Sequence, residues 1–517
     1  MQKEFNITGL CIPERHFMVD ILHRLQKIHT MIEKGQYFVV SRPRQFGKTT
    51  TLFLLKNYLQ EKYIVLSLSF EGTGDETFET EKVFANAFVK LIKNSLTIQK
   101  EELLLKTISE DKLENLNDLN QFISNLVLNA KKGIILLIDE VDKTFTSPIF
   151  LNFLSLLRDK YLKRNAGEDQ TFQSVILAGL HDVKNLKTRL RNEEQAVQNS
   201  PWNIATNFTM DMSFSPKEIS TMLIDYTYTY NLTFDISMIS EKLYFYSNGY
   251  PSLVSRLCKI IDEVFLESKK ENWTTEHIEN SVKELLKENN TLFESVIKNI
   301  ENNPELYNVV YRIVLDGEKI LYNYNNPIIE LGVLHGIFIN ANGDVKISNR
   351  IFEQLIYDYL ISKLQTSEAI KPDSIDSSFV TGQKLNLERV LLKFQEFRKE
   401  QHSEKDLQFI ERHGRLLFLS FLKPIINGHG FDFREVEISE ERRLDITVTF
   451  YNQKYIIELK IWRGEESHDR GLSQLADYLE RTGLSEGYLL IFQNKKAKEF
   501  KQQTIFHNGK SIFAVWV

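Results

Sequence analysis

The sequence contains few cysteines, glycines and prolines for its length. Among 517 residues there are two cysteines, Cys11 and Cys258, which lie far apart along the chain. This usage fits a reducing compartment and excludes a disulfide scaffold or a four-cysteine zinc site, so we expect a cytoplasmic protein. Glycine and proline number 22 and 10, and 42 % of the residues are hydrophobic. The composition therefore excludes a collagen-like or disordered chain and indicates a folded one.

The chain also lacks long apolar runs and an excess of positive charge. The longest apolar stretches, such as 133–138 and 416–422, fall far short of the roughly 20 residues that a membrane helix needs. We therefore expect neither secretion nor a membrane partner. The 64 lysines and arginines against 70 acidic residues give a formal charge of −6. Binding to nucleic acid has to come from a local site, because the protein as a whole does not attract phosphate.

The length predicts two to four domains, and the first is of the α/β class. From residue 36 to about 214, short β-branched or aliphatic runs alternate with amphipathic stretches, which is typical of a parallel sheet covered by helices. The expected strands are Tyr37–Val40, Ile64–Phe70, Ile134–Ile138, Ser174–Gly179 and Thr206–Met212.

The residues after 214 divide into four further segments. Ser215, Pro216 and Glu218 form a helix start, and Gly249 followed by Pro251 separates two helices. Two short apolar runs around an Asn-rich turn at 340–344 predict a hairpin after helices, as in a winged-helix module. The predicted boundaries are an α/β core over 1–214, a helical lid over 215–290, a winged-helix-like region over 291–364, a linker over 365–383 and a second α/β domain over 384–517.

Residues 41–50 lie between an expected strand and an expected helix, the layout of a phosphate-binding loop. Backbone N–H groups and the positive helix end then face the ligand, Lys48 reaches the β and γ phosphates, and the Thr49 hydroxyl binds Mg²⁺. The usual motif has a glycine where this chain has Arg42, so an ordinary loop is the alternative. The predicted nucleotide-binding residues of the loop are Arg44, Gln45, Phe46, Gly47, Lys48, Thr49 and Thr50.

A second part of the nucleotide site is expected about ninety residues downstream. The apolar run 133–138 ends in Asp139 and Glu140. Hydrolysis of a γ-phosphate needs one carboxylate for magnesium and another to orient water, so we assign Asp139 to the metal and Glu140 as the base. Solvated acids at a turn are the alternative. His181 or Asp182, after the next strand, could sense the γ-phosphate.

These segments resemble the bacterial AAA-like P-loop ATPases related to the STAND and archaeal-type ATPase groups. The resemblance rests on Phe5–Gly9, Tyr37–Thr50, Leu137–Glu140 and Ser247–Pro251, and spans roughly residues 5 to 360. It implies an additional-strand ATPase core, a helical lid, a winged-helix region, ATP as the nucleotide and association into a homo-oligomer through the ATPase domain. It also implies an arginine that completes the site. Arg256 is our candidate in the lid, and Arg158, Arg189 and Arg191 are candidates between subunits, with solvent-facing arginines as the alternative.

The C-terminal segment predicts a β-hairpin that carries charged residues. Two β-branched runs, 444–450 and 455–460, flank a turn at 451–454. If Tyr451 pairs with Lys454, Asp445 lies opposite Lys460, and Glu458 shares their face. Charges within such apolar strands are costly unless they are paired or bind a metal. A cross-strand salt bridge on a solvated face is the alternative.

The chemistry that fits these residues is metal-assisted phosphodiester hydrolysis. We expect Asp445 and Glu458 to bind one or two Mg²⁺, with Mn²⁺ as an alternative, and Lys460 to position the nucleophile. Gln474 and Tyr478 are spaced i, i+4 on a predicted helix and can face the same groove. The upstream acids Glu411 and Glu435 and the basic run 495–498 are weaker candidates, for the metal and for a phosphate backbone, and solvated residues are the alternative.

The segment 444–478 resembles RecB-like members of the PD-(D/E)XK nuclease superfamily, and the resemblance extends over about residues 384 to 517. It is carried by Asp445, by Glu458-Leu459-Lys460 and by Gln474 with Tyr478, while Leu444 replaces the proline that names the motif. It implies nuclease activity and a nucleic-acid partner, with DNA preferred over RNA. We therefore expect an ATP-dependent or ATP-gated DNA nuclease, which bacteria could use in defence against phage or mobile DNA. The alternative is a switch ATPase that binds DNA or a partner, with a silent nuclease-like domain.

Overall fold

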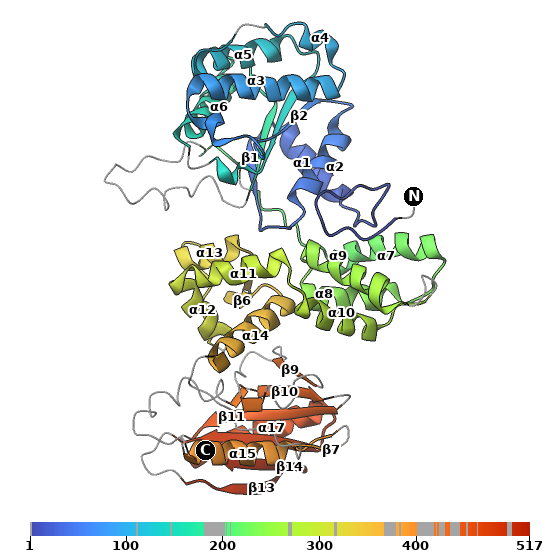
Figure 1. Ribbon diagram of the computed structural model, residues 1–517, viewed down its shortest axis with the longest axis vertical. Coiled ribbons are helices and arrows are strands. Elements are labelled where there is room, and N and C mark those ends of the chain that lie inside the picture. The colour runs from blue at the N-terminus through green and yellow to red at the C-terminus, as the bar shows by residue number, and fades with distance from the viewer. Residues whose placement is uncertain are drawn as a thin grey trace, which may run out of the picture. The chain divides into compact units, whose positions relative to one another are not determined.

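The protein is described here from a computed structural model of the full chain (Figure 1). The structure describes residues 3–517 except 110–111, 145–146, 180–201, 203, 207, 267–270, 315–317, 367–378, 382–383, 401–417, 420, 423–429, 435–444, 451–452, 463 and 494–498. The chain divides into two compact units, one of Met1–Asn299, Asn323–Ile339 and Ser348–Phe352, the other of Ile300–Tyr322, Asn340–Ile347 and Glu353–Val517. Among the described helices, none combines the length and the apolar character that a membrane crossing needs.

A four-stranded parallel sheet forms the centre of the first unit. Its strands lie in the order β1-β4-β3-β2, so β4 is inserted between β1, which leads into the phosphate loop, and β3, which carries Asp139. This is the expected additional-strand arrangement of a P-loop core. The strands are β1 (Phe38–Ser41), β2 (Ile64–Ser69), β3 (Ile134–Asp139) and β4 (Ser174–Gly179).

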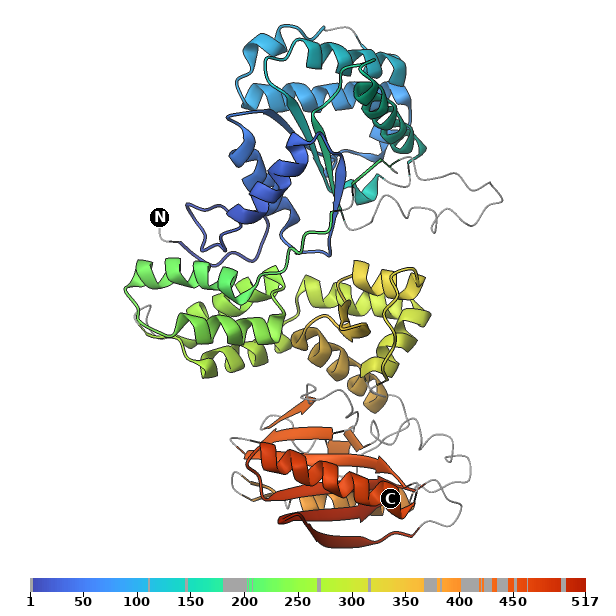
Figure 2. The same cartoon turned by 180° about the vertical axis from the view of Figure 1, so that it is seen from behind.

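Helices cover both faces of this sheet (Figures 1 and 2). The helices α1 and α2 lie on one side, and α3, α5 and α6 pack on the other through a cluster of buried phenylalanines that includes Phe84, Phe88 and Phe153. Strand β3 is buried throughout its apolar part, which explains its unbroken aliphatic sequence. The helices are α1 (Leu22–Glu33), α2 (Lys48–Leu59), α3 (Glu81–Ile98), α4 (Glu102–Leu105), α5 (Leu116–Leu128) and α6 (Pro148–Ala166), with short 3-10 turns η1 (Asp75–Phe78) and η2 (Val141–Lys143).

The expected fifth strand, Thr206–Met212, is wrong except for its first residue. Thr206 makes an isolated parallel bridge with Phe38, and the described residues after it are not extended into a strand. Arginine side chains take the carbonyl groups that a neighbouring strand would otherwise bind. Arg24 donates to Met212 O and Ser213 O at 2.7 Å each, and Arg42 donates to Met210 O. The segment is therefore held by side chains and not by a ladder.

A helical bundle follows the core within the first unit. The predicted start at Ser215 is confirmed as a capping box, in which Ser215 and Glu218 each bind the other's backbone N–H. The predicted break between two helices is also found, because α8 ends at Ser247 and α9 begins at Pro251. The elements are α7 (Pro216–Tyr230), α8 (Ile236–Ser247), α9 (Pro251–Ile260), a π turn η4 (Ile261–Phe265) and α10 (Thr275–Lys287).

The next region contains four helices and the expected small hairpin. Strands β5 (Phe338–Ala341) and β6 (Asp344–Ile347) form a two-stranded sheet around Asn342 and Gly343, both with positive φ. The helices are α11 (Thr291–Glu301), α12 (Pro304–Val314), α13 (Pro327–Leu334) and α14 (Arg350–Thr366). Of the predicted linker, α14 takes the first two residues and residues 367–378 lie outside the described part.

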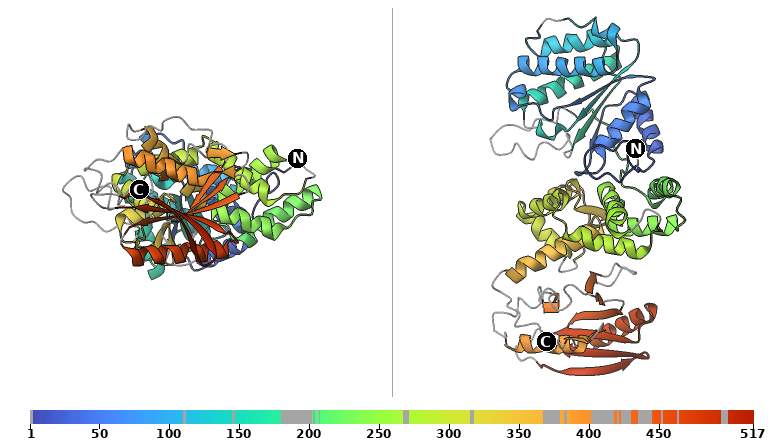
Figure 3. Two further views of the ribbon diagram at one scale, coloured as in Figure 1. Left: turned by 90° about the horizontal axis from the view of Figure 1, so that it is seen from below. Right: turned by 45° about the vertical axis from the view of Figure 1, so that its right-hand side comes forward.

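The C-terminal domain is a mixed six-stranded sheet between two helices. The strands lie in the order β13-β14-β12-β11-β10-β9, with antiparallel pairs at both edges and parallel β11-β12-β14 in the middle. Viewed from below, the sheet lies between α15 and α17, which cover opposite faces (Figure 3). The elements are β7 (Val380–Thr381), β8 (Lys384–Leu385), α15 (Leu387–Glu400), β9 (Gly430–Arg434), β10 (Asp445–Phe450), β11 (Gln453–Ile461), α17 (Glu465–Arg481), β12 (Glu486–Phe492), β13 (Gln502–His507) and β14 (Lys510–Trp516).

Candidate nucleotide and nuclease sites

The phosphate loop turns sharply between β1 and α2 by means of two residues with positive φ. Gln45 has a φ of 54° and Gly47, the N-cap of α2, a φ of 77°. The positive φ is the reason that glycine is favoured at position 47. A side-chain carbon added there would meet no atom within 4 Å, so the space at the N-terminus of α2 is open. An open helix N-terminus of this kind can accept a phosphate.

Lys48 lies inside this loop and is held by it. Its ammonium donates to the carbonyls of Arg42 and Pro43, both at 2.8 Å. Burial lowers the pKa of Lys48, and the nearby carboxylates of Asp142, Asp139 and Glu140 oppose that shift. The residue is thus a pre-positioned cation that can exchange its carbonyl partners for phosphate oxygens.

Asp142 is an acid that our sequence reasoning missed. It lies in η2, three residues after Asp139, and among the acids near Lys48 its charge has the largest effect on the lysine pKa. Its Oδ1 would lie 2.8 Å from a side-chain carbon built on Gly179, at the end of β4. The spacing Asp139, Glu140, Asp142 is the one signal in the sequence that could have pointed to it.

The structure brings Thr49 and Asp139 together, as expected for a shared metal site. The Thr49 hydroxyl donates to Asp139 Oδ2 at 2.7 Å, while Asp139 Oδ1 accepts from the Glu140 backbone N–H at 2.9 Å. Glu140 has a φ of 56°, so the chain turns abruptly there. A hydroxyl and a carboxylate in contact beside a phosphate loop fit the ligands that Mg²⁺ prefers.

Arg42, which replaces the first glycine of the usual motif, contacts residues that lie outside the loop. Its guanidinium donates to Ser41 O at 2.6 Å and to Met210 O, and lies 5.4 Å from the centre of the Phe208 ring. Burial lowers its pKa, and Asp211 opposes the shift. The arginine therefore ties the loop to the segment that leads into the helical bundle, a role that only the tertiary structure reveals.

Pro43, Arg44 and Phe46 of the loop also contact the bundle and the segment that follows α13. The Tyr250 hydroxyl donates to Arg44 O at 2.6 Å, and its ring lies edge-on to Phe46, 4.8 Å between centres. Gly336 approaches Pro43 so closely that an added side-chain carbon would lie 2.9 Å from it. Tyr250 and Gly336 therefore help to hold the loop in place.

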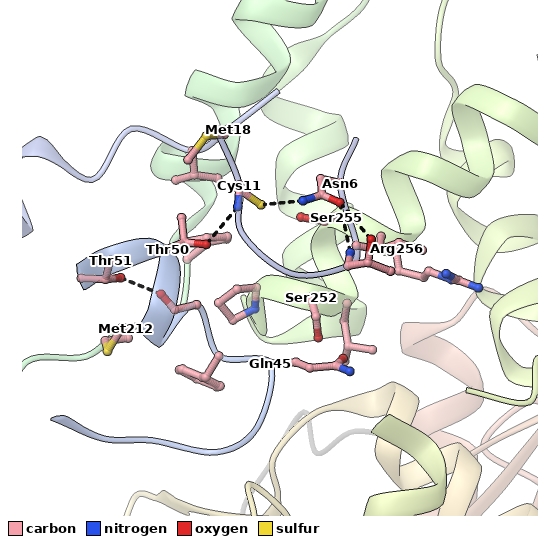
Figure 4. A pocket seen from close by; sticks show the side chains of 18 of the residues that line it. Asn6, Cys11, Met18, Gln45, Thr50, Thr51, Met212, Ser252, Ser255 and Arg256 are labelled. Carbon is pink, nitrogen blue, oxygen red and sulfur yellow. Dashed lines mark hydrogen bonds between the residues drawn. The ribbon is translucent and has the colours of Figure 1, made fainter. Parts of the chain in front are cut away.

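A cavity of about 460 Å³ adjoins the end of the phosphate loop (Figure 4). Its walls come from the N-terminal segment, from the loop and from α9, and include Asn6, Cys11, Gln45, Thr50, Ser252 and Arg256. The Cys11 backbone N–H donates to Thr50 Oγ1 at 3.3 Å, which holds the N-terminal segment against α2. Burial raises the pKa of the Cys11 thiol. A cavity of this size accommodates a small organic ligand.

The expected lid arginine lines this cavity but is paired with an acid. Arg256 Nε donates to Glu288 at 2.8 Å, and Arg256 Nη2 lies 2.6 Å from the same oxygen. Gln45, also in the cavity wall, donates to Thr291 Oγ1 at 3.2 Å. Of the other candidates, Arg189 and Arg191, with His181 and Asp182, lie outside the described residues, and Arg158 lies on α6.

In the C-terminal domain, the register of the central hairpin differs from our expectation by two residues. Phe450 pairs with Gln453, so Asp445 lies directly opposite Glu458 and not opposite Lys460. Strand β10 ends at Phe450 and β11 begins at Gln453, so the paired strands are separated by two residues that start one position earlier than we assumed. Because the register differs by an even number of residues, positions 445, 458 and 460 still lie on one face of the sheet, as predicted.

Glu458, Lys460 and Gln474 form one connected group. The Lys460 ammonium lies 2.7 Å from Glu458 Oε1 and donates to Gln474 Oε1 at 3.0 Å. Glu458 is 3 % exposed, so its charge is buried against the lysine. Gly471 of α17 makes room for the lysine, since an added carbon would lie 3.1 Å from Lys460 Cε. Tyr478 instead packs into the apolar core beneath α17.

The backbone register places position 445, an aspartate, directly opposite Glu458 on the neighbouring strand. Carboxylate oxygens suit a hard cation, which could take the place of Lys460 as the positive partner of the buried Glu458. Within the described residues, no cluster of three or more His, Cys, Asp or Glu side chains forms a larger metal site. Glu411, Glu435 and the basic run 495–498 lie outside the described part.

The fold and the two sites define the class of protein. The first part is a P-loop ATPase fold of the additional-strand type, and the second is an α/β fold with the Asp, Glu-x-Lys and Gln positions of a PD-(D/E)XK nuclease. The chain belongs to the AAA-like domain family, whose model matches residues 16–357, and residues 430–503 match the PD-(D/E)XK nuclease superfamily. Domains of these two classes use ATP and divalent metal ions. The chain therefore joins an ATPase to a nuclease domain.

The solved structures that match the chain are distant from it in sequence. The Walker-type ATPase of Pyrococcus abyssi is 13 % identical, covering 68 % of this chain and 99 % of its own, with a TM-score of 0.46. The Orc1 protein of Aeropyrum pernix in complex with DNA is 12 % identical over 67 % of this chain and 94 % of its own, with a TM-score of 0.31. The RuvB protein of Thermotoga maritima is 12 % identical over 65 % and 95 %, with a TM-score of 0.34. Comparison with curated proteins gave no match.

Proposed function

We propose that the protein is an ATP-controlled, Mg²⁺-dependent nuclease that cleaves DNA and serves in bacterial defence against phage or mobile DNA. The observation that carries the proposal is the group of Glu458, Lys460 and Gln474, with position 445 directly opposite Glu458. A buried carboxylate beside a lysine is costly in a structural strand and useful in phosphodiester hydrolysis.

In the nuclease domain we assign each residue a separate task. The carboxylates of Asp445 and Glu458 hold the metal, which when bound lowers the pKa of a water and stabilises the leaving oxygen. Lys460 gives up its contact with Glu458 and positions the attacking water or offsets charge on the phosphate. Gln474 keeps the lysine aimed at the reacting group through its 3.0 Å hydrogen bond.

In the ATPase domain we assign the phosphates to the loop and the nucleoside to the adjoining cavity. Lys48 and the backbone N–H groups at the start of α2 bind the phosphates, and Thr49 with Asp139 would hold Mg²⁺, which neutralises phosphate charge when bound. Glu140 orients and deprotonates the attacking water. Arg256, in the cavity wall, gives up its ion pair with Glu288 and binds a phosphate of the nucleotide. Nucleotide binding thereby changes the contacts of the helical lid.

The test is cleavage of plasmid and linear DNA with Mg²⁺ or Mn²⁺, with and without ATP. We expect Glu458→Ala to abolish cutting because it removes a metal ligand, and Lys460→Ala because it removes the group that positions the water or offsets charge on the phosphate. Lys48→Ala should change the dependence of cutting on ATP. Lys454→Ala, on the same strand but exposed, is the matched control and should cut as the natural protein does.

Two outcomes would contradict the proposal. If Glu458→Ala cuts as fast as the natural protein, the nuclease assignment is wrong. If no strand is cut under any condition while ATP is hydrolysed, the protein is better described as a switch ATPase that binds DNA or a partner.

A further inference from the structure

Three aromatic rings and a lysine gather at the end of β11, beside the nuclease residues. The ring of His468 lies 5.5 Å from those of both Trp462 and Trp516, and the two indoles are 6.4 Å apart. The Lys501 ammonium lies 4.5 Å from the centre of the Trp516 ring and 5.8 Å from that of Trp462. We call this group the aromatic shelf.

The position of Trp462 links the shelf to the nuclease centre. Its backbone N–H donates to Phe492 O at 2.8 Å, which extends the pairing of β11 with β12 beyond Ile461. Alternation then places Trp462 on the face of Glu458 and Lys460, two residues past the lysine. Trp462 also packs against the apolar cluster beneath α17, the helix that supplies Gln474. The shelf and Lys460 therefore share one face at one end of the sheet.

The side chains of the aromatic shelf differ in exposure to solvent, from a buried tryptophan to an exposed lysine. Trp516 is 3 % exposed and forms the floor, Trp462 and His468 are half-buried, and Lys501 is exposed. Burial lowers the pKa of His468, so at neutral pH its ring is an uncharged aromatic surface. A packing core alone has no need of an exposed cation at its rim, whereas a flat aromatic surface with an adjacent lysine matches a base and its phosphate.

We propose that the aromatic shelf binds an unpaired nucleobase of single-stranded DNA, or of a DNA strand end, next to the scissile phosphate. The base stacks on Trp462 and His468, and Lys501 contacts the neighbouring phosphate. This inference rests on the proposed nuclease function and adds to it a substrate preference for unpaired strands over blunt duplex.

The test measures binding separately from cleavage. The full-length protein carrying Glu458→Gln is titrated into a fluorescein-labelled oligothymidylate and, in parallel, into a blunt duplex. We expect Trp462→Ala to weaken single-strand binding about 5-fold or more, the usual contribution of one stacked base, and to change duplex binding little. Lys501→Ala should weaken it and lower the slope of log affinity against log salt by about 0.7. Phe506→Ala, an 81 % exposed aromatic on β13, is the matched control and should bind normally.

A second measurement guards against a folding defect. Trp462→Phe keeps the packing, and it should remove the quenching of tryptophan emission that the oligonucleotide causes, whereas Trp273→Phe, in the first unit, should preserve it. If Trp462→Ala binds single strands as well as its parent, or if Phe506→Ala weakens binding as much, the shelf is a packing cluster and the inference is wrong.

Failure of the inference differs from failure of the proposed function. If the natural protein cleaves DNA but Trp462→Ala binds single strands as well as its parent, the inference about the shelf is wrong and the proposed nuclease function stands. If single-strand binding depends on Trp462 but no DNA is cleaved, the inference about the shelf stands and the proposed nuclease function is wrong. If the protein neither binds nor cuts DNA, both are overturned.

Discussion

At the scale of single residues, Lys160 shows how this fold accommodates a charge in its core. The lysine lies on α6 with no exposed side-chain surface, and its ammonium forms an ion pair with Asp169 at 2.7 Å. It also donates to Ser124 Oγ at 2.6 Å and Asn120 Oδ1 at 2.8 Å. Since each of these contacts offsets the cost of burial, the lysine is tolerated and joins α5 to α6.

Removing this lysine should destabilise the ATPase core strongly. We expect Lys160→Ala to lower the free energy of unfolding by about 3 kcal/mol, because it leaves Asp169 without its partner. Denaturant unfolding at pH 7 checks this. Lys163→Ala, which breaks an exposed pair with Asp159 on the same helix, is the control and should have no measurable effect. A loss of similar size in both variants would contradict the argument.

The same pair predicts a pH dependence. Burial alone would raise the pKa of Asp169, but hydrogen bonds from Lys160 and Ser124 outweigh burial and lower it below its ordinary value of 3.8. A lowered carboxyl pKa stabilises the fold above pH 3.8, and this contribution is lost as the pH falls through the folded-state pKa. The difference between the natural protein and Lys160→Ala should therefore be constant from pH 7 to pH 5 and shrink only below pH 4. A difference that already falls near pH 6 would point to another group.

At the scale of elements, the junction between α8 and α9 depends on a glycine. Gly249 has a φ of 71°, and its carbonyl accepts from Phe214 N at 2.8 Å. A side-chain carbon there would lie 2.0 Å from Phe214 O, which is backbone and cannot move aside. Phe214, which precedes the helical bundle, and Gly249, between α8 and α9, are thus in backbone contact at a position where only glycine fits.

Gly249→Ala should be much more damaging than the same change elsewhere. Gly72 is the matched control, because its φ is 78° and an added carbon meets no atom within 4 Å. We expect Gly72→Ala to cost about 1–2 kcal/mol from backbone strain alone, and Gly249→Ala to cost at least about 2 kcal/mol more, because the backbone must shift. Thermal unfolding of both variants compares them, and equal losses would show that the close approach is not rigid.

At the scale of the whole molecule, the division into two compact units separates the nucleotide site from the nuclease site. All residues of the phosphate loop and of the adjoining cavity belong to the first unit, and Glu458, Lys460 and Gln474 belong to the second. Ligand binding to one unit stabilises that unit directly. Calorimetry can therefore assign each site to its unit.

We expect two thermal transitions, of which Mg²⁺ with ATP raises one. At a hundred times its dissociation constant, ATP should add about 2.7 kcal/mol to the first unit and nothing to the second. Lys48→Ala should abolish the shift. Leu475→Ala, a buried residue beneath α17, marks the C-terminal transition by lowering it alone. If ATP raises both transitions, the stabilisation is not confined to the first unit and the assignment is wrong.

Local features of both sites could be predicted from the sequence, because they depend on neighbours along the chain. The strand Ser174–Gly179 is found at the predicted residues, and β3 begins at Ile134 as predicted, since unbroken aliphatic runs have few alternatives to burial in a sheet. The loop containing Gly47 and Lys48, the acids at the end of β3 and the motif of Glu458 with Lys460 are local for the same reason. The contact of Thr49 with Asp139 joins two of these local features, whereas the contact of Lys460 with Gln474 was not predicted.

Contacts between distant segments were decided only by the tertiary structure. Asp445 pairs with Glu458 and not with Lys460, because the register of a hairpin follows from the packing of two whole strands. Arg24 and Arg42 bind the carbonyls of Met210, Met212 and Ser213, in a segment where the local pattern favours a strand. The N-terminal residues reach the phosphate loop through Cys11 and Thr50, 39 residues apart. Which chemical groups the protein carries, and on which elements most of them lie, can thus be inferred from neighbours along the chain. Which of these groups meet depends on the fold, because long-range contacts follow from the packing of complete elements.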